Sequence, residues 1–96
     1  MSNEEPVRNP CNKCLENVVK MAIVDDKPIM MDYWVDSLNG RALIGVREGG
    51  EKLLVKSEEE YTSPIAKIYK VETEYIILTE NSVYIVSTDI QSKRIS

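Results

Sequence analysis

The sequence predicts a mainly β fold: a small antiparallel β-meander barrel or sandwich of about six or seven short strands, with at most one or two short helices. Short apolar or alternating segments follow one another through residues 29–88. Turn signals separate them, among which Asn39-Gly40 and Gly49-Gly50 are the clearest. The length of 96 residues allows one domain with a modest core, and Phe is absent, so five Tyr and one Trp supply the aromatic area.

Composition divides the chain into three parts. Residues 1–10 (MSNEEPVRNP) are polar, contain two prolines and show no hydrophobic period, which is typical of a flexible arm. We expect a single β-rich domain over 11–91 and a frayed tail over 92–96.

The first patterned segment supports both a helix and a strand. Helical spacing is met by Leu15, Val18, Val19 and Ala22, with Asn12 as a possible N-cap. Strand-like alternation is met by Val19, Met21 and Ile23, and β-branched residues favour extended chain. We therefore expect a short helical turn near Cys14–Val18, followed by extended chain up to a turn at Asp25–Pro28.

The next segment, Ile29–Asp36 (IMMDYWVD), alternates and predicts a strand. One side carries Ile29, Met31, Tyr33 and Val35; the other carries Met30, Asp32, Trp34 and Asp36. A hairpin turn at Asn39-Gly40 follows.

Two further strands, 41–48 and 51–57, flank Gly49-Gly50, whose freedom at positive φ allows a two-residue loop. The register that follows pairs Val46 with Leu53 and Ile44 with Val55.

Beyond an acidic loop at 57–64, three more strands are expected over 65–72, 75–79 and 83–88. The first of them has a helical alternative over 65–70, because Pro64 suits the first position of a helix. We favour the strand because the segment leads into a hairpin turn at 72–74.

The net charge of −4 is spread evenly, since each half of the chain carries eight acidic and six basic side chains. No basic stripe emerges, and nucleic acid is the weaker candidate partner for that reason. A small barrel that stacks single-stranded bases on Tyr69, Tyr75 and Tyr84 stays as an alternative function.

Apolar runs are short, for example the four residues Met21–Val24, so neither a membrane span nor a signal peptide is expected. We expect a cytoplasmic protein, in which thiols are normally reduced.

The two cysteines form a Cys11-x-x-Cys14 pair. The chain has no His and no third Cys, so a Cys/His zinc site cannot close within one chain, whereas two chains can share a Cys₄ site. The polar arm before Cys11 lacks the strand that precedes a thioredoxin-type dithiol. We favour reduced thiols without a function, which serine can replace without harm. A zinc-linked structural dimer is the alternative, ahead of a disulfide or redox activity.

Catalysis is not expected. Without His the chain lacks the commonest general base and cannot assemble a Ser-His or Cys-His pair. Asp32 and Asp36 share one face of the predicted strand but would lie about 13 Å apart along it, too far to act as a close pair.

The expected partner-binding residues are Met30, Asp32, Trp34 and Asp36. A Trp exposed beside a Met is a common binding anchor, although a single Trp in a small domain is often buried, and that orientation stays open. We therefore expect a non-catalytic protein-interaction module of the accessory, inhibitor or adaptor type. Phage or viral origin is compatible with its size and class. The module is expected to form a homo-oligomer, because a small core often completes its burial through a partner.

Overall fold

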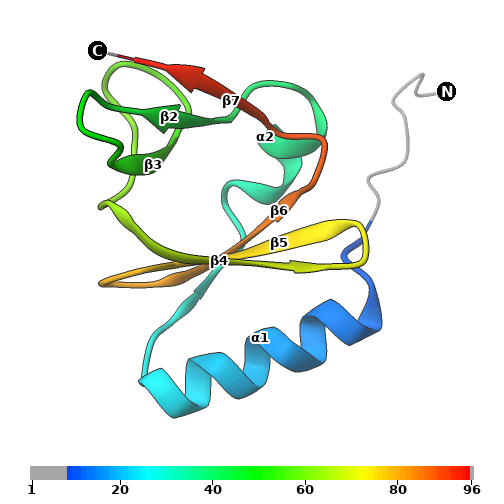
Figure 1. The fold of residues 1–96 in the computed structure, drawn as a ribbon. Helices are drawn as coiled ribbons and strands as arrows, with labels where there is room; N and C mark the ends of the chain where they lie inside the picture. The colour runs from blue at the N-terminus through cyan, green and yellow to red at the C-terminus, as the bar shows by residue number, and fades with distance from the viewer. Residues whose placement is uncertain (1–8, 96) are drawn as a thin grey trace, which may run out of the picture.

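The computed structural model describes residues 9–95, which form two helices and two β-sheets. The elements follow one another as α1 (Asn12–Asp25), β1 (Ile29–Met30), α2 (Trp34–Leu38), β2 (Leu43–Val46), β3 (Lys52–Val55), β4 (Ile65–Val71), β5 (Glu74–Thr79), β6 (Val83–Ser87) and β7 (Gln91–Arg94). Most of the arm predicted over 1–10 lies outside the described residues. Figure 1 shows three layers, with α1 against one face of the large sheet and the small sheet over the other.

The large sheet has the strand order β1-β6-β5-β4. Its strands β4, β5 and β6 form an antiparallel meander, and Glu72 turns the chain between β4 and β5 at a φ of 54°. The two-residue strand β1 pairs parallel to β6, with Ile29 beside Val83 and Met30 beside Tyr84.

The small sheet has the strand order β3-β2-β7. β3 is antiparallel to β2, while β7 runs parallel to it. The frayed tail predicted over 92–96 is therefore wrong for most of its length, because Gln91–Arg94 pair with Leu43–Val46. Beyond them, the N–H of Ile95 donates to the carbonyl of Val46 at 3.0 Å.

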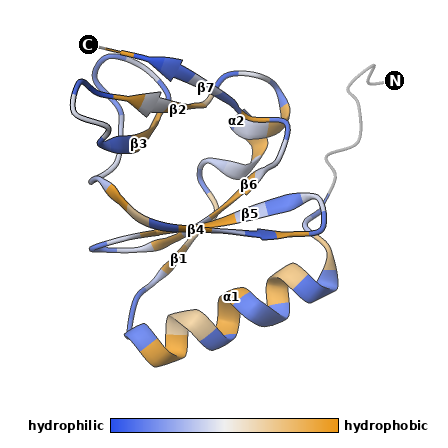
Figure 2. Ribbon diagram, in the orientation of Figure 1, coloured by the Kyte–Doolittle hydropathy of each residue, from blue (hydrophilic) through white to orange (hydrophobic). Residues whose placement is uncertain are grey.

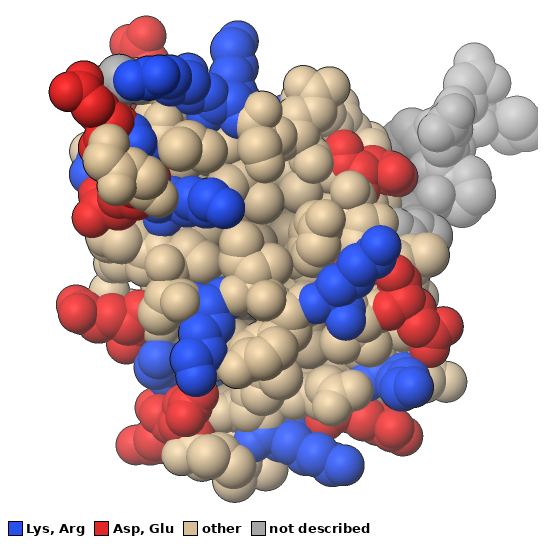
Figure 3. All heavy atoms as spheres, viewed as in Figure 1, with Lys and Arg blue, Asp and Glu red and all other residues tan. Residues whose placement is uncertain are grey.

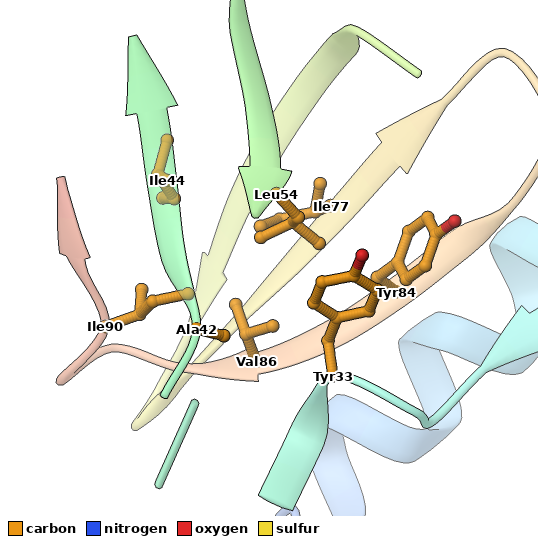
Figure 4. Packing of buried hydrophobic residues seen from close by; sticks show 8 residues of the cluster. All are labelled: Tyr33, Ala42, Ile44, Leu54, Ile77, Tyr84, Val86 and Ile90. Atoms are coloured by element: carbon orange, nitrogen blue, oxygen red, sulfur yellow. The ribbon is translucent and has the colours of Figure 1, made fainter. Parts of the chain in front are cut away.

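Strands β5 and β6 are buried on both faces, so the domain has two cores. The core under α1 contains Cys14, Val18, Trp34, Ile76, Leu78, Val83 and Ile85. The core under the small sheet contains Tyr33, Ala42, Ile44, Leu54, Ile77, Tyr84, Val86 and Ile90, which converge in Figure 4. Consecutive residues such as Ile76 and Ile77 thus serve opposite layers.

The mainly β fold with few helices is confirmed. The strands predicted near 65–72, 75–79 and 83–88 are present as β4, β5 and β6, so the helical alternative over 65–70 is wrong. The pairs β1–β6 and β2–β7 are parallel, whereas we predicted an antiparallel meander. No helix within residues 9–95 is long and apolar enough to cross a membrane.

The first segment is a longer helix than predicted. α1 runs through all of Asn12–Asp25 and ends where Asp26 adopts a left-handed conformation, with its N–H directed to the carbonyls of Ala22 and Ile23. The alternation at 19–23 misled the prediction because α1 carries apolar side chains on its outer side as well as on the side that faces the sheet.

The predicted strand over Ile29–Asp36 is also wrong. Only Ile29–Met30 is extended, and the chain then turns into α2. Residues 29–36 pass around the edge of the large sheet. Their alternating side chains therefore pack into the cores on both faces of that sheet, although they do not lie on one strand.

The register across Gly49-Gly50 is shifted by one residue from the prediction. Both glycines have positive φ, as expected, but the loop has the three residues 48–50, because the N–H of Arg47 donates to the carbonyl of Glu51 at 2.8 Å. The observed pairs are Gly45 with Leu53 and Leu43 with Val55. A shift of one residue exchanges the faces of a strand, so Leu53 points away from the core that Leu54 joins.

Candidate protein-binding surfaces

The helix α2 closes the edge of the large sheet where β1 ends. β1 pairs with only the first two residues of β6, and beyond them the N–H of Ser87 donates to the hydroxyl of Ser37 at 2.9 Å. The same hydroxyl donates to the carbonyl of Trp34 at 2.6 Å. A buried side chain thus replaces the missing strand partner at this position.

This arrangement buries the predicted anchor. Trp34 is 3% exposed in the core under α1, and Met30 is half-buried against the other core. An exposed Trp34 beside Met30 is therefore wrong as a binding site, because the segment wraps the sheet edge and turns both side chains inward.

Asp32 and Asp36 converge on Lys56, the residue that follows β3. The Lys56 ammonium lies 3.9 Å from a carboxylate oxygen of Asp32 and 3.4 Å from one of Asp36, and Glu60 approaches it to 3.6 Å. It also lies 4.5 Å from the centre of the Tyr33 ring, a cation–π geometry. Two aspartates expected about 13 Å apart along a strand thus share one cation, which anchors the loop before α2.

Three other side chains of this segment face outward. Ile29, Met31 and Val35 are 38%, 41% and 42% exposed, and we call them the β1–α2 patch. Ile29 pairs beside Val83, so it points to the same face of the large sheet as α1. The predicted partner site was Met30, Asp32, Trp34 and Asp36. The residues of the β1–α2 patch belong to the other side of the predicted strand.

The outer side of α1 is the most exposed apolar surface. Leu15, Val19 and Ile23 repeat every four residues and are 36%, 48% and 74% exposed; we call them the α1 stripe. Val24, the next residue after Ile23 in the chain, is 81% exposed. Figure 2 shows hydrophobic residues recurring along the whole length of α1. The spacing of Leu15 and Val19 was visible in the sequence, but it did not say which side of the helix faces the core.

The cysteine pair forms the start of α1. The Cys11 sulfur accepts the N–H of Cys14 at 3.3 Å and so caps the helix, while the Cys14 side chain is fully buried. The N–H of Cys11 donates to the buried carboxylate of Glu74 at 3.0 Å, which also accepts the hydroxyl of Thr73. The two cysteines therefore contribute to the structure: Cys11 caps α1 and Cys14 fills the core, so we expect Cys14→Ser to destabilise the fold, against the expectation that serine replaces both without harm.

Titration favours the protonated forms of the buried groups. Burial, with the nearby Glu74 carboxylate, raises the pKa of the Cys14 thiol to about 11. The hydrogen bond from the Cys14 N–H lowers the pKa of the Cys11 thiol, but Glu74 and burial outweigh it and the net direction is upward. Burial and then the Asp32 charge raise the pKa of Tyr33 to about 12. Near neutral pH these groups are therefore in their protonated forms, which are the weaker nucleophiles.

No cluster of three or more Cys, Asp or Glu side chains within residues 9–95 is placed to hold a metal ion. A zinc site shared between two chains would need Cys14 to leave the core, because its side chain has no exposed surface.

The tyrosines do not make a common stacking face. Tyr84 is 9% exposed and forms an edge-to-face pair with Tyr33, their ring centres 5.5 Å apart. Tyr75 packs half-buried against the same core, whereas Tyr69 pairs beside Ile76 and so points to the α1 side. The stacking surface predicted from Tyr69, Tyr75 and Tyr84 is therefore split between two faces.

Comparison of the chain with protein families, with characterised proteins and with solved structures finds no match.

Proposed function

We propose that this protein is a non-catalytic interaction module that binds another protein through the α1 stripe and also associates with itself. The observation that carries the proposal is the apolar character of α1 on two sides. Cys14 and Val18 are buried in the core, while Val19 and Ile23 stay 48% and 74% exposed. A row of exposed apolar side chains next to the buried side of a helix is typical of a surface that a partner covers.

The spacing of the α1 stripe suits one mode of recognition. Apolar side chains at i, i+4 and i+8 of a helix fit a hydrophobic groove on a partner, and the charged Glu16 and Lys20 lie between them in sequence. The β1–α2 patch supports a second contact, since Ile29 points to the same face of the large sheet. Met31 adds a side chain that adapts easily to different partner surfaces.

The absence of catalysis is part of the proposal. The chain has no His, and the Cys14 and Tyr33 side chains have raised pKa values that favour their unreactive protonated forms. A cytoplasmic location, and an accessory, inhibitor or adaptor role of phage or viral type, are kept with it as expectations. The zinc-linked dimer and the nucleic-acid binder rank below it, because Cys14 is buried and the tyrosines face apart.

The test compares three immobilised proteins for capture of host proteins, with identification by mass spectrometry. The wild type and a Met31→Lys/Val35→Lys variant are expected to retain a shared protein that a Val19→Lys/Ile23→Lys variant loses. Lysine is a good helix former, and Val19→Lys places an ammonium three residues after Glu16, so the helix should be kept. Equal retention by both variants contradicts the role of the α1 stripe, and loss only in the Met31/Val35 variant moves binding to the β1–α2 patch.

A further inference from the structure

The outer face of the small sheet carries a groove that no helix covers. It has a volume of about 340 Å³ and is lined by Arg47, Leu53, Val55, Glu58, Tyr61 and Ile95, together with Ser57. We call it the outer groove. Leu53 forms its floor and is 1% exposed, whereas Tyr61 and Ile95 on its rim are 53% and 40% exposed.

The groove is built by segments far apart in the sequence. Tyr61 is held beside Val55 by an isolated antiparallel bridge. Ile95 is held by the hydrogen bond from its N–H to Val46, and its side chain lies over Gly45, where a Cβ would come within 2.7 Å of the Ile95 Cδ1. Only glycine at position 45 leaves room for the Ile95 side chain. The fold therefore fixes the position of Ile95 on the apolar rim of the groove.

Charges of opposite sign mark the two ends of the groove. Arg47 lies before β3 begins and Glu58 lies after β3 ends, so the length of the strand separates them by roughly 13 Å. Beyond Arg47, the pocket at the end of β2 and β7 is lined by Lys93 and Arg94 and by one acidic residue, Glu48, so its charge is positive on balance. Beyond Glu58 the chain continues with Glu59 and Glu60. Figure 3 shows several basic side chains at the upper end of the molecule, where β2 and β7 lie, with acidic side chains beside them at the upper left.

We propose that the outer groove is the interface of a symmetric homodimer, in which two copies pack groove to groove about a two-fold axis. In a two-fold interface the same patch meets itself, so it must be self-complementary. An apolar centre with a positive and a negative end meets that condition. Rotation by half a turn brings Arg47 of each copy to the partner's Glu58 and places the two Tyr61 rings over the shared apolar floor.

The ion pair that Arg47 makes within its own chain is compatible with the proposed dimer. Its guanidinium lies 2.9 Å from Glu51 in the same chain, but both side chains are more than 40% exposed, and exposed pairs of this kind contribute little. Arg47 can therefore bind a partner carboxylate at little cost. The inference rests on the self-associating half of the proposed function and is independent of what the α1 stripe binds.

The test measures the dimer dissociation constant by sedimentation and light scattering over a range of concentrations. Arg47→Glu puts like charges at both contacts of its own dimer, and so does Glu58→Arg, so each variant alone is expected to dimerise about tenfold more weakly or worse. An equimolar mixture of the two variants is expected to form a heterodimer, because each contact then joins one Glu and one Arg. Arg41→Glu and Glu80→Arg make the same charge changes outside the groove and are the controls.

A neutral variant completes the test. Tyr61→Ser removes an exposed ring without changing charge, and it is expected to yield monomer with an unchanged circular dichroism spectrum. Failure of the mixed variants to associate overturns the two-fold pairing. A dimer that survives Tyr61→Ser but is lost with Val19→Lys/Ile23→Lys overturns the groove while self-association through α1 stands. A wild type that is monomeric at every concentration overturns self-association itself.

Discussion

Tyr33 and Trp34 are neighbours in the chain but pack into different cores, on opposite faces of the large sheet. Tyr33 meets Tyr84 edge to face on the small-sheet side, while Trp34 lies with Cys14 and Val18 under α1. The segment that joins them wraps the sheet edge and starts α2, which completes the edge of β6 through Ser37. This segment therefore contributes side chains to both cores, and it also carries the exposed residues of the β1–α2 patch.

Ser37 is predicted to be important for stability because its hydroxyl serves two buried backbone groups. Ser37→Ala removes the acceptor of the Ser87 N–H and the donor to the Trp34 carbonyl, in a position that is 2% exposed. Loss of the acceptor of a buried N–H costs about 1–3 kcal/mol, so the free energy of unfolding should fall by about that amount. Urea denaturation followed by the fluorescence of the only Trp measures it.

Ser57→Ala is the matched control, because the Ser57 hydroxyl accepts one exposed N–H, that of Glu59, which water can replace. Equal stability of both variants and the wild type would mean that α2 does not complete the edge of β6.

The sequence predicted the meander well because its signals are local. Period-two alternation and two short turns define β4, β5 and β6, and each strand pairs with its neighbour in the chain. β7 was missed because Gln91–Arg94 are polar and exposed, and the segment becomes a strand only by pairing with β2, some 48 residues away.

The site was harder to predict for a related reason. Tyr33 and Trp34 point in opposite directions. Neighbouring residues do so on a strand, and they also do so in a turn that passes around a sheet edge. The alternating pattern therefore could not distinguish a strand from such a turn. The convergence of Asp32 and Asp36 on Lys56 joins segments 20 or more residues apart, for which a single sequence carries no signal. The α1 stripe was visible as helical spacing, but the side of α1 that is covered depends on the sheet.

Lys56 is predicted to hold the loop before α2 by neutralising the carboxylates around it. Lys56→Met keeps the length of the side chain but leaves three carboxylates without their cation, and at pH 7 it should lower the free energy of unfolding by about 1–2 kcal/mol. At high salt the attraction between these partly exposed charges is screened, so the difference from the wild type should shrink. Lys52→Met, on the exposed start of β3, is the control. A loss of stability that is equal at low and at high salt would assign the effect to packing on Tyr33 instead of charge.

Gly45 is predicted to be required by the side chain that covers it. In Gly45→Ala the new Cβ would lie 2.7 Å from Ile95 Cδ1 and 2.9 Å from Val55 Cγ2, closer than carbon atoms tolerate. The variant should lose about 1–3 kcal/mol of stability in thermal or urea unfolding. Adding Ile95→Ala to it removes one of the two close approaches and should recover part of the loss, while Ile95→Ala alone gives the reference for the cycle. If Gly45→Ala is as stable as the wild type, Ile95 does not lie over the small sheet.

Cys14 is predicted to be needed in the core and to make stability depend on alkaline pH. Its folded pKa is about 11 against an ordinary value of 9.0, so between these pH values the unfolded chain releases a proton that the folded chain keeps. The folded state then binds more protons than the unfolded state, and the free energy of unfolding falls as pH rises through this window. The raised pKa of Tyr33 acts in the same direction at higher pH, from its ordinary 10.0 to about 12.

Urea unfolding at pH 8, 9 and 10 should therefore show declining stability, with a shallower decline in Cys14→Ala, which lacks the buried thiol. Cys11→Ser keeps an acceptor at the helix cap and should stay close to the wild type, whereas Cys14→Ser buries a hydroxyl beside Val18 and should lose about 1–3 kcal/mol. Metal analysis of the wild type belongs to the same experiment, and chelator should change neither its stability nor its oligomeric state. Stoichiometric zinc at one ion per two chains, together with a dimer that chelator dissociates, would instead show that Cys14 leaves the core and that the zinc-linked dimer is correct.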